Sequence, residues 1–157
     1  MKTIIIYATN YGSTKLIAEK IANELTDTTL HNITSTERFS LKDYDCVILG
    51  SPLKAGIIRK EIKNFAKINE KELMTKRLGL FVSGMMPSGE ELYFSKNYSP
   101  ELIDAAIVTS FLGGVYDPSK CNILERFMFR TAALLDSYTD RIERDKIFAF
   151  ADELSAM

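Results

Sequence analysis

Residues 7–14, Tyr-Ala-Thr-Asn-Tyr-Gly-Ser-Thr, join an apolar segment that predicts a β-strand to an amphipathic segment that predicts a helix. The strand residues Thr3–Tyr7 are β-branched or aromatic, as is typical of a buried strand. After the loop, Ile17, Ile21 and Leu25 recur every four positions, which indicates a helix. The quoted segment therefore lies where the predicted strand changes to the predicted helix.

This joining loop is rich in groups that can donate hydrogen bonds. It holds the hydroxyls of Thr9, Ser13 and Thr14, the amide of Asn10, and one glycine, Gly12. A helix N-terminus favours an anion because its first N–H groups are free and its dipole is positive there. The loop has neither the G-x-x-x-x-G-K-[ST] motif of nucleoside triphosphate sites nor the G-x-G-x-x-G motif of dinucleotide sites. We therefore predict that it binds the phosphate of a mononucleotide. The alternative is that these residues only cap the helix, and the loop alone favours neither interpretation.

Length and composition predict one globular domain over residues 1–157, with 46% hydrophobic residues. The 20 basic and 21 acidic residues give a net charge of −1, which argues against nucleic-acid binding. No segment reaches the length of a membrane-spanning helix, and the N-terminus lacks the pattern of a signal peptide. Cys46 and Cys121 are far apart and have no metal-ligand spacing, so we expect a reduced, cytoplasmic protein without a metal site.

Strand and helix patterns alternate along the whole chain. The later strands are predicted by four segments: Thr28–Ile33, Asp45–Gly50, Leu78–Ser83 and Ala105–Phe111. Amphipathic segments between them predict helices, one of which carries Ile58, Ile62 and Phe65 on one face, and Ile147, Phe150, Ala151 and Leu154 mark the inward face of the last helix. Parallel strands need such crossovers, so we predict an α/β fold with a doubly wound parallel sheet between two helical layers.

Polar loops follow the first, third, fourth and fifth predicted strands. In doubly wound sheets, ligands bind beyond the carboxyl ends of the strands, where the strand order reverses. We therefore expect these loops to converge on one site, which favours phosphate binding over simple capping for the loop at residues 9–14.

With this loop after the first strand and this alternation of strands and helices, the chain resembles the flavodoxin family. The segment Thr9–Thr14 (T-N-Y-G-S-T) is similar to that family's phosphate loop in sequence and in position. The resemblance implies a five-stranded sheet of order 2-1-3-4-5 and FMN as the cofactor. It implies that the FMN phosphate is bound by Thr9, Asn10, Tyr11, Gly12, Ser13 and Thr14. It also places the flavin ring against Ser51, Pro52, Leu53, Lys54, Ala55 and Gly56 on one side, and against Ser83, Gly84, Met85 and Met86 at the pyrimidine end.

Three further segments resemble one branch of the family, the menaquinone-dependent protoporphyrinogen dehydrogenases. They are YDCVILGSPLKAG at 44–56, FLGGVYD at 111–117 and ILERFMFR at 123–130. The resemblance implies a helical insertion at about 117–140, with its helix at Cys121–Leu135. This insertion is strongly basic in that branch, whereas here it carries only Lys120, Arg126 and Arg130 up to residue 135.

Three functions therefore stay open: an FMN electron-transfer protein, an FMN-dependent quinone-linked dehydrogenase of the porphyrinogen-oxidising type, and a non-redox or cofactor-free module of the same fold. A phosphoacceptor receiver domain is excluded, because Ala8-Thr9-Asn10 and Gly50-Ser51 stand where it needs acidic residues. The expected partners are a redox protein or a quinone. The apolar segment Cys121–Leu135 predicts a contact surface, either for a homodimer, for a redox partner or for a membrane surface.

Individual roles within the site follow from residue type. The phosphate should be held by neutral donors, because no basic residue lies inside the loop. A backbone carbonyl near Lys54–Gly56 is expected to accept a hydrogen bond from the flavin during one-electron chemistry, with Gly56 tolerating the change of backbone conformation. Tyr93, Tyr98 and Tyr116 are the candidates for contact with the flavin ring, beside Met85 and Met86.

Overall fold

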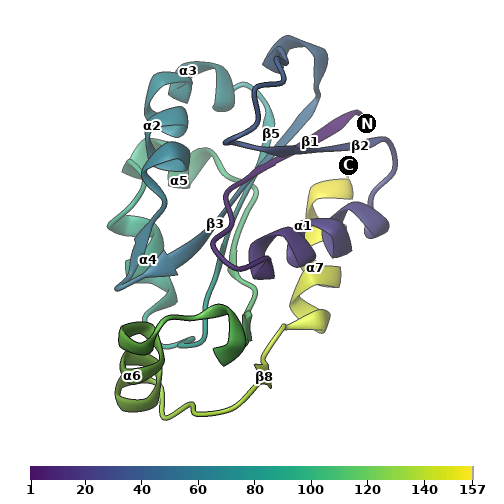
Figure 1. The fold of residues 1–157 in the computed structure, drawn as a ribbon. Coiled ribbons are helices and arrows are strands. Elements are labelled where there is room, and N and C mark those ends of the chain that lie inside the picture. Colours follow the sequence, from purple (N-terminus) through teal and green to yellow (C-terminus); the bar gives the residue numbers. More distant parts are fainter. Residues whose placement is uncertain (157) are drawn as a thin grey trace.

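The computed structural model describes residues 1–156. Its central sheet has five parallel strands in the order β2-β1-β3-β5-β6, and a short strand, β4, pairs antiparallel with the end of β3 (Figure 1). When only the five parallel strands are numbered along the chain, so that β5 is the fourth and β6 the fifth, this is the predicted order 2-1-3-4-5. The strands are β1 Thr3–Tyr7, β2 Thr28–Asn32, β3 Cys46–Lys54, β4 Ile57–Ile58, β5 Arg77–Ser83 and β6 Val108–Phe111.

Helices cover both faces of the sheet, and a small two-stranded sheet lies outside it. The helices are α1 Ser13–Glu24, α2 Lys60–Ile68, α3 Glu70–Leu73, α4 Glu90–Ser95, α5 Pro100–Ala105, α6 Ile123–Ala132 and α7 Arg144–Ser155, with short 3-10 turns at Leu41–Asp43 and Pro118–Lys120. The small sheet pairs β7 Val115–Tyr116 with β8 Thr139–Asp140. Among residues 1–156, no helix is both long enough and apolar enough to cross a membrane.

The strands divide the core into two layers because successive side chains point to opposite faces. Ile4 and Ile6 pack with the helices α2, α4 and α5, whereas Ile5 and Tyr7 pack with α1 and α7. Both faces are buried, which explains why the strands appear in the sequence as nearly continuous apolar runs. Figure 1 shows α1 and α7 on one side of the sheet and α2–α5 on the other.

Four predicted boundaries were wrong. β3 continues through Ser51–Lys54, because these residues pair with β5 and β4. Ile58 belongs to β4, and α2 begins only at Lys60. The fifth parallel strand begins at Val108, since the Ser99 cap and Pro100 start a helix that runs through Ala105. α6 is shorter than Cys121–Leu135, because Asn122 caps it and Leu134 has a positive φ of 56°.

Residues between β7 and α7 form a lobe beyond the carboxyl ends of the parallel strands. The lobe contains the 3-10 turn Pro118–Lys120, α6 and β8 (Figure 1). A small cluster of Met85, Tyr116, Cys121 and Leu135 packs under it, with Phe129 against the cluster. The ring centroids of Tyr116 and Phe129 are 4.5 Å apart. α6 is therefore held at the edge of the sheet where the polar loops end.

Candidate functional site

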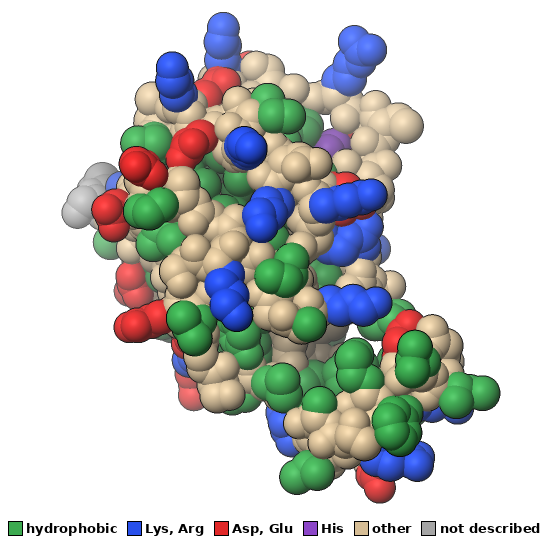
Figure 2. Space-filling view, turned by 90° about the vertical axis from the view of Figure 1, so that its left-hand side faces the viewer, with side chains coloured by type: hydrophobic (Ala, Val, Ile, Leu, Met, Phe, Trp, Pro, Cys, Tyr) green, Lys and Arg blue, Asp and Glu red, His purple; other side chains and the backbone are tan. Residues whose placement is uncertain are grey.

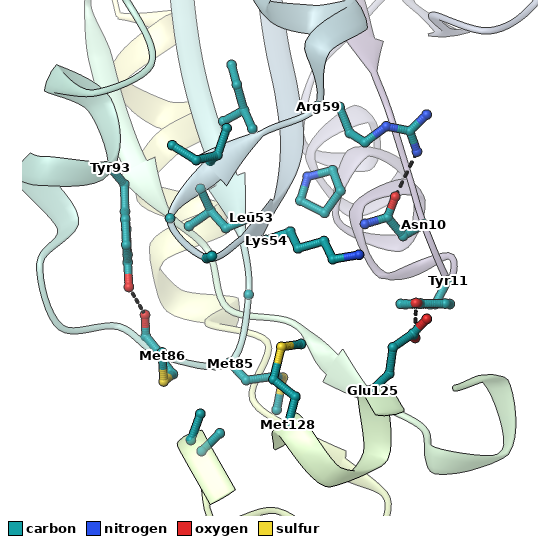
Figure 3. A pocket seen from close by; sticks show the side chains of 18 of the residues that line it. Asn10, Tyr11, Leu53, Lys54, Arg59, Met85, Met86, Tyr93, Glu125 and Met128 are labelled. Carbon is teal, nitrogen blue, oxygen red and sulfur yellow. Dashed lines mark hydrogen bonds between the residues drawn. The ribbon is translucent and has the colours of Figure 1, made fainter. Parts of the chain in front are cut away.

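An open cleft of about 1210 Å³ lies at the carboxyl edge of the sheet. One end is formed by Thr9–Tyr11, one side by residues 52–61, and the floor by Gly84–Met86 (Figure 3). The opposite side is α6, which contributes Met128 and Phe129. Segments far apart in the sequence thus surround one space, as the strand order predicts.

The loop at the end of the cleft has the geometry of an anion site. Gly12 has a φ of 95°, and its N–H donates to Thr9 Oγ1 at 2.9 Å. Gly12 is also the N-cap residue of α1, and no side chain among residues 1–156 caps this helix. The N–H groups of Asn10, Tyr11, Ser13, Thr14 and Lys15 donate to no acceptor within residues 1–156. The capping alternative therefore fails, because the helix N-terminus is left open.

Two loop hydroxyls are arranged so that they can donate to a ligand. Ser13 Oγ accepts the N–H of Val115 at 3.0 Å, and Thr9 Oγ1 accepts the N–H of Gly12. Each hydroxyl is used as an acceptor, so its own proton is free for an anion. The third hydroxyl differs: Thr14 Oγ1 lies 2.7 Å from Ser83 Oγ, and both residues are buried. This pair ties the start of α1 to the end of β5.

The structure brings eleven of the sixteen predicted site residues to the cleft. They are Thr9, Asn10, Tyr11, Pro52, Leu53, Lys54, Ala55, Gly56, Gly84, Met85 and Met86. The other five do not line it: Thr14, Ser51 and Ser83 are buried, and Gly12 and Ser13 are partly exposed at the start of α1. Ser51 Oγ accepts the N–H of Arg59 at 2.9 Å and donates to the carbonyl of Pro52, so it supports the hairpin that forms one side.

That side is a tight β-hairpin between β3 and β4. Lys54 pairs with Ile57, and the two residues between them, Ala55 and Gly56, have φ values of 51° and 76°. Positive φ at both central positions is the pattern of a type I′ turn, whose twist suits a two-residue hairpin. Asn97 holds the turn: its side chain donates to the Gly56 carbonyl at 2.9 Å and accepts the Ile58 N–H at 3.1 Å.

The floor of the cleft is fixed by hydrogen bonds to its backbone. Arg141 Nη1 donates to the Met85 carbonyl at 3.0 Å, and the Tyr93 hydroxyl donates to the Met86 carbonyl at 2.8 Å. The Met85 side chain is buried and that of Met86 is half-exposed. Of the three tyrosine candidates, only Tyr93 lines the cleft; Tyr98 and Tyr116 are buried elsewhere.

α6 forms the opposite side with an apolar inner face, which sequence reasoning did not place against the cleft. Met128, Phe129, Ala132 and Ala133 line the space. The helix is joined to the loop of residues 9–14, called the anion loop below, by a hydrogen bond from the Tyr11 hydroxyl to the Glu125 carboxylate (Figure 3). Burial and this carboxylate raise the pKa of Tyr11 to about 12, so its hydroxyl stays a neutral donor at physiological pH.

The outer face of α6 is exposed. Ile123, Leu124 and Phe127 are 84%, 76% and 62% exposed, which is high for large apolar side chains. Figure 2 shows the lobe below the main body with hydrophobic side chains over much of its visible surface. The predicted excess of apolar surface on this segment is thus present on the side away from the cleft.

Basic residues line the cleft although the chain is nearly neutral. Lys54, Arg59, Lys60 and Lys96 line it, against the carboxylates Glu61 and Glu125. Arg59 was missed by sequence reasoning, because it lies 45 positions or more from the anion loop, outside any local motif. Its guanidinium lowers the pKa of Glu61 to about 2 through hydrogen bonds and charge. The residues 1–156 contain no cluster of His, Cys, Asp and Glu side chains suited to a metal ion.

These features fit FMN. The open N-terminus of α1 and the two free hydroxyl protons suit a phosphate, and the apolar walls with free polar groups at their edges suit a flat heteroaromatic ring. The loop provides one open helix N-terminus next to one cleft, which suits a mononucleotide without the glycine motif of a dinucleotide site. The donor groups of the loop fit the phosphate of a mononucleotide.

Comparison with known proteins agrees with this geometry. A family model described as a flavodoxin domain matches residues 4–141. No curated protein matches the sequence significantly. Among solved structures, oxidised flavodoxin 1 from Bacillus cereus is 18% identical with a TM-score of 0.61, covering 98% of this chain and 97% of that chain.

Two other solved structures are similar over nearly their full lengths. A flavodoxin, WrbA-like protein from Agrobacterium tumefaciens is 20% identical with a TM-score of 0.57, covering 98% of this chain and 96% of its own. A flavodoxin from Streptococcus pneumonia TIGR4 is 16% identical with a TM-score of 0.60, and the match covers 99% of this chain and 98% of that chain. At these identities the likeness concerns the fold.

Proposed function

This chain belongs to the flavodoxin-domain family, and we propose that it binds FMN and transfers electrons. The observation that carries the proposal is the open N-terminus of α1, next to Thr9–Tyr11 at one end of an apolar cleft. A phosphate at the loop and a ring in the cleft would use both features together. FMN supplies the electron transfer when bound, and the protein contributes binding, orientation and the electrostatic surroundings.

The roles of the residues follow from their contacts. The free N–H groups of the loop and the hydroxyls of Thr9 and Ser13 would hold the phosphate. The side chains of Leu53, Met85 and Met128 would exclude water from the ring. The Gly56 carbonyl already accepts from Asn97, which leaves the Ala55 carbonyl as the free backbone acceptor at the hairpin turn within residues 1–156.

The test begins with the purified protein. We expect a yellow protein whose flavin is released on denaturation, or a colourless apoprotein that quenches FMN fluorescence on titration. Reductive titration of the loaded protein should then show reversible electron uptake. A protein that binds neither FMN nor riboflavin would instead support the cofactor-free module of the same fold.

A second candidate is the quinone-linked dehydrogenase. It is supported by the apolar inner face of α6, where Met128, Phe129, Ala132 and Ala133 offer a second wall to an apolar substrate. Incubating the FMN-loaded protein with a porphyrinogen and a soluble naphthoquinone tests it, since oxidation produces a fluorescent porphyrin. If porphyrin fluorescence does not rise above that of the apoprotein control, the dehydrogenase is refuted and electron transfer to a protein partner is the function that remains.

The exposed outer face of α6 supports the expected contact with another protein, whether a redox partner or a second copy of this chain. Ile123, Leu124 and Phe127 are exposed there. Sedimentation of the wild type and of Leu124→Ser distinguishes the two: a dimer that dissociates in the variant supports a homodimer, and a monomer in both cases favours a separate partner.

A further inference from the structure

Arg59 lies against the anion loop although it comes from a distant segment. It follows β4 and is the N-cap residue of α2. Its Nη1 donates to the side-chain oxygen of Asn10 at 2.7 Å (Figure 3). The same nitrogen donates to the carbonyl of Thr9 at 3.4 Å. A cation thus touches a loop that contains no basic residue of its own.

Both the side chain and the backbone of Arg59 are held in place by hydrogen bonds. Glu61 accepts from Arg59 Nε at 3.1 Å and from Nη2 at 2.9 Å, a two-point pair. The backbone N–H of Arg59 donates to Ser51 Oγ at 2.9 Å. Because Glu61 engages the Nε side of the fork, Nη1 is the nitrogen that faces the loop. This arrangement reduces the conformational entropy that Arg59 would lose on binding a ligand.

The acceptors that Arg59 Nη1 contacts are neutral and replaceable. One is a backbone carbonyl, and the other is the amide of Asn10, an exposed residue whose side chain can rotate away. A phosphate oxygen is a stronger acceptor for a guanidinium than either, because the hydrogen bond is then charge-assisted on both sides. Exchange of Asn10 for a phosphate oxygen therefore requires little rearrangement.

We propose that Arg59 is a phosphate-binding residue of the FMN site, which Glu61 holds in position and which selects FMN over riboflavin. The inference rests on the proposed FMN binding. It replaces the expectation that neutral donors alone hold the phosphate. Lys120 is a weaker candidate for this role, since its Nζ is exposed and makes a single contact of 3.4 Å with the Tyr11 carbonyl.

The experiment titrates apoprotein with FMN and with riboflavin, which lacks the phosphate, and follows quenching of flavin fluorescence. We compare the wild type with Arg59→Met, Arg59→Lys and the control Lys63→Met, which makes the same charge change at an exposed position on α2. Arg59→Met should weaken FMN binding about ten- to a hundredfold, the range for a hydrogen bond to a charged group. Riboflavin binding should change less than about twofold.

Arg59→Lys should recover part of the FMN affinity because it keeps the charge but not the fork, and Lys63→Met should bind both flavins as the wild type does. Equal losses for FMN and riboflavin in Arg59→Met would overturn the inference, since Arg59 would then only support the hairpin. Unchanged FMN binding would overturn it as well. A wild type that binds neither flavin would instead refute the proposed function itself.

Salt dependence provides a measurement that needs no variant, in case Arg59→Met does not fold. The wild-type affinity for FMN should fall severalfold between about 50 and 500 mM KCl, and the affinity for riboflavin should stay constant, because salt screens a charge–phosphate contact. An FMN affinity that is as insensitive to salt as that of riboflavin would contradict a charged phosphate contact.

Discussion

The side-chain amide of Asn97 donates a hydrogen bond of 2.9 Å to the carbonyl of Gly56, at the tip of the β3–β4 hairpin. The same amide group donates to the Tyr93 carbonyl at 2.6 Å, and its oxygen accepts the N–H of Ile58. Asn97 is only 4% exposed. One buried side chain therefore joins the hairpin to α4 and fixes the side of the cleft that would contact the flavin ring.

Asn97→Ala should destabilise the fold by about 2–3 kcal/mol, because it leaves the Ile58 N–H buried without a partner. The hairpin should also lose its fixed position, so binding of FMN and of riboflavin should weaken by the same factor. Thermal unfolding and flavin titration test both effects. This equal loss differs from the selective loss expected for Arg59→Met; a selective loss of FMN in Asn97→Ala would mean that the hairpin does not contact the ring.

Gly50 leaves room for the ring of Phe81 on the neighbouring strand. A Cβ at Gly50 would lie 2.1 Å from Phe81 Cζ, and Phe81 is fully buried. Gly50→Ala should therefore cost about 1–3 kcal/mol through overpacking. The double variant Gly50→Ala with Phe81→Leu should be more stable than the sum of the single losses predicts. Denaturant unfolding of all four proteins measures this coupling; simple additivity would show that Phe81 is free to move.

Ala55 adopts a φ of 51° that suits Asn or Gly better than Ala. Ala55→Asn should stabilise the protein by about 0.5–1 kcal/mol, because Asn tolerates this region in a type I′ turn. Gly56→Ala, at a φ of 76°, should have the opposite effect and destabilise by about 1 kcal/mol. Urea unfolding distinguishes the two; a shift of the same sign in both variants would contradict the turn geometry.

Glu61 gives a stability that depends on pH. Its hydrogen bonds with Arg59 lower the carboxyl pKa from 4.5 to about 2. Because this carboxyl has a lower pKa in the folded state than in the unfolded state, its ionisation stabilises the folded protein. This stabilisation is present above pH 4.5, the unfolded pKa, and is lost as the pH falls towards 2, the folded pKa. Solvent screening keeps it below about 1 kcal/mol.

We therefore expect Glu61→Gln to lower the melting temperature at pH 7 and to approach the wild type as the pH falls below 4.5. The control is Glu153→Gln, an exposed residue that forms no ion pair within residues 1–156. It should leave the melting temperature close to that of the wild type across this pH range. A difference for Glu61→Gln that persists unchanged at pH 2 would show that charge is not the cause.

The Tyr11 hydroxyl joins the anion loop to α6 through Glu125. Tyr11→Phe should loosen α6 and increase hydrogen exchange of its backbone amides, with a loss of about 0.5–1.5 kcal/mol in local stability. The matched control is Tyr138→Phe, because Tyr138 is 62% exposed. Exchange in the strands β1 and β3 should stay unchanged in both variants. Equal exchange of α6 in the two variants would show that this hydrogen bond does not hold the lobe.

The sequence by itself determined the layers of the fold. Continuous apolar strands and amphipathic helices alternate, and parallel pairing then requires crossovers over both faces of the sheet. The change of period at residues 7–14 placed the anion loop, and the apolar excess of Cys121–Leu135 indicated exposed surface there. These features are local, because they depend on side-chain type and on spacing within one element.

Only the tertiary structure decided which side chains meet. It assigned Thr14 to a buried pair with Ser83, extended β3 into the segment expected as a loop, and set α6 against the cleft. It also brought Arg59 to the anion loop. Such pairs depend on strand order and on the position of distant loops, which no local pattern records. The family was readable from the sequence, whereas the charged groups and the walls of the cleft came from contacts across the fold.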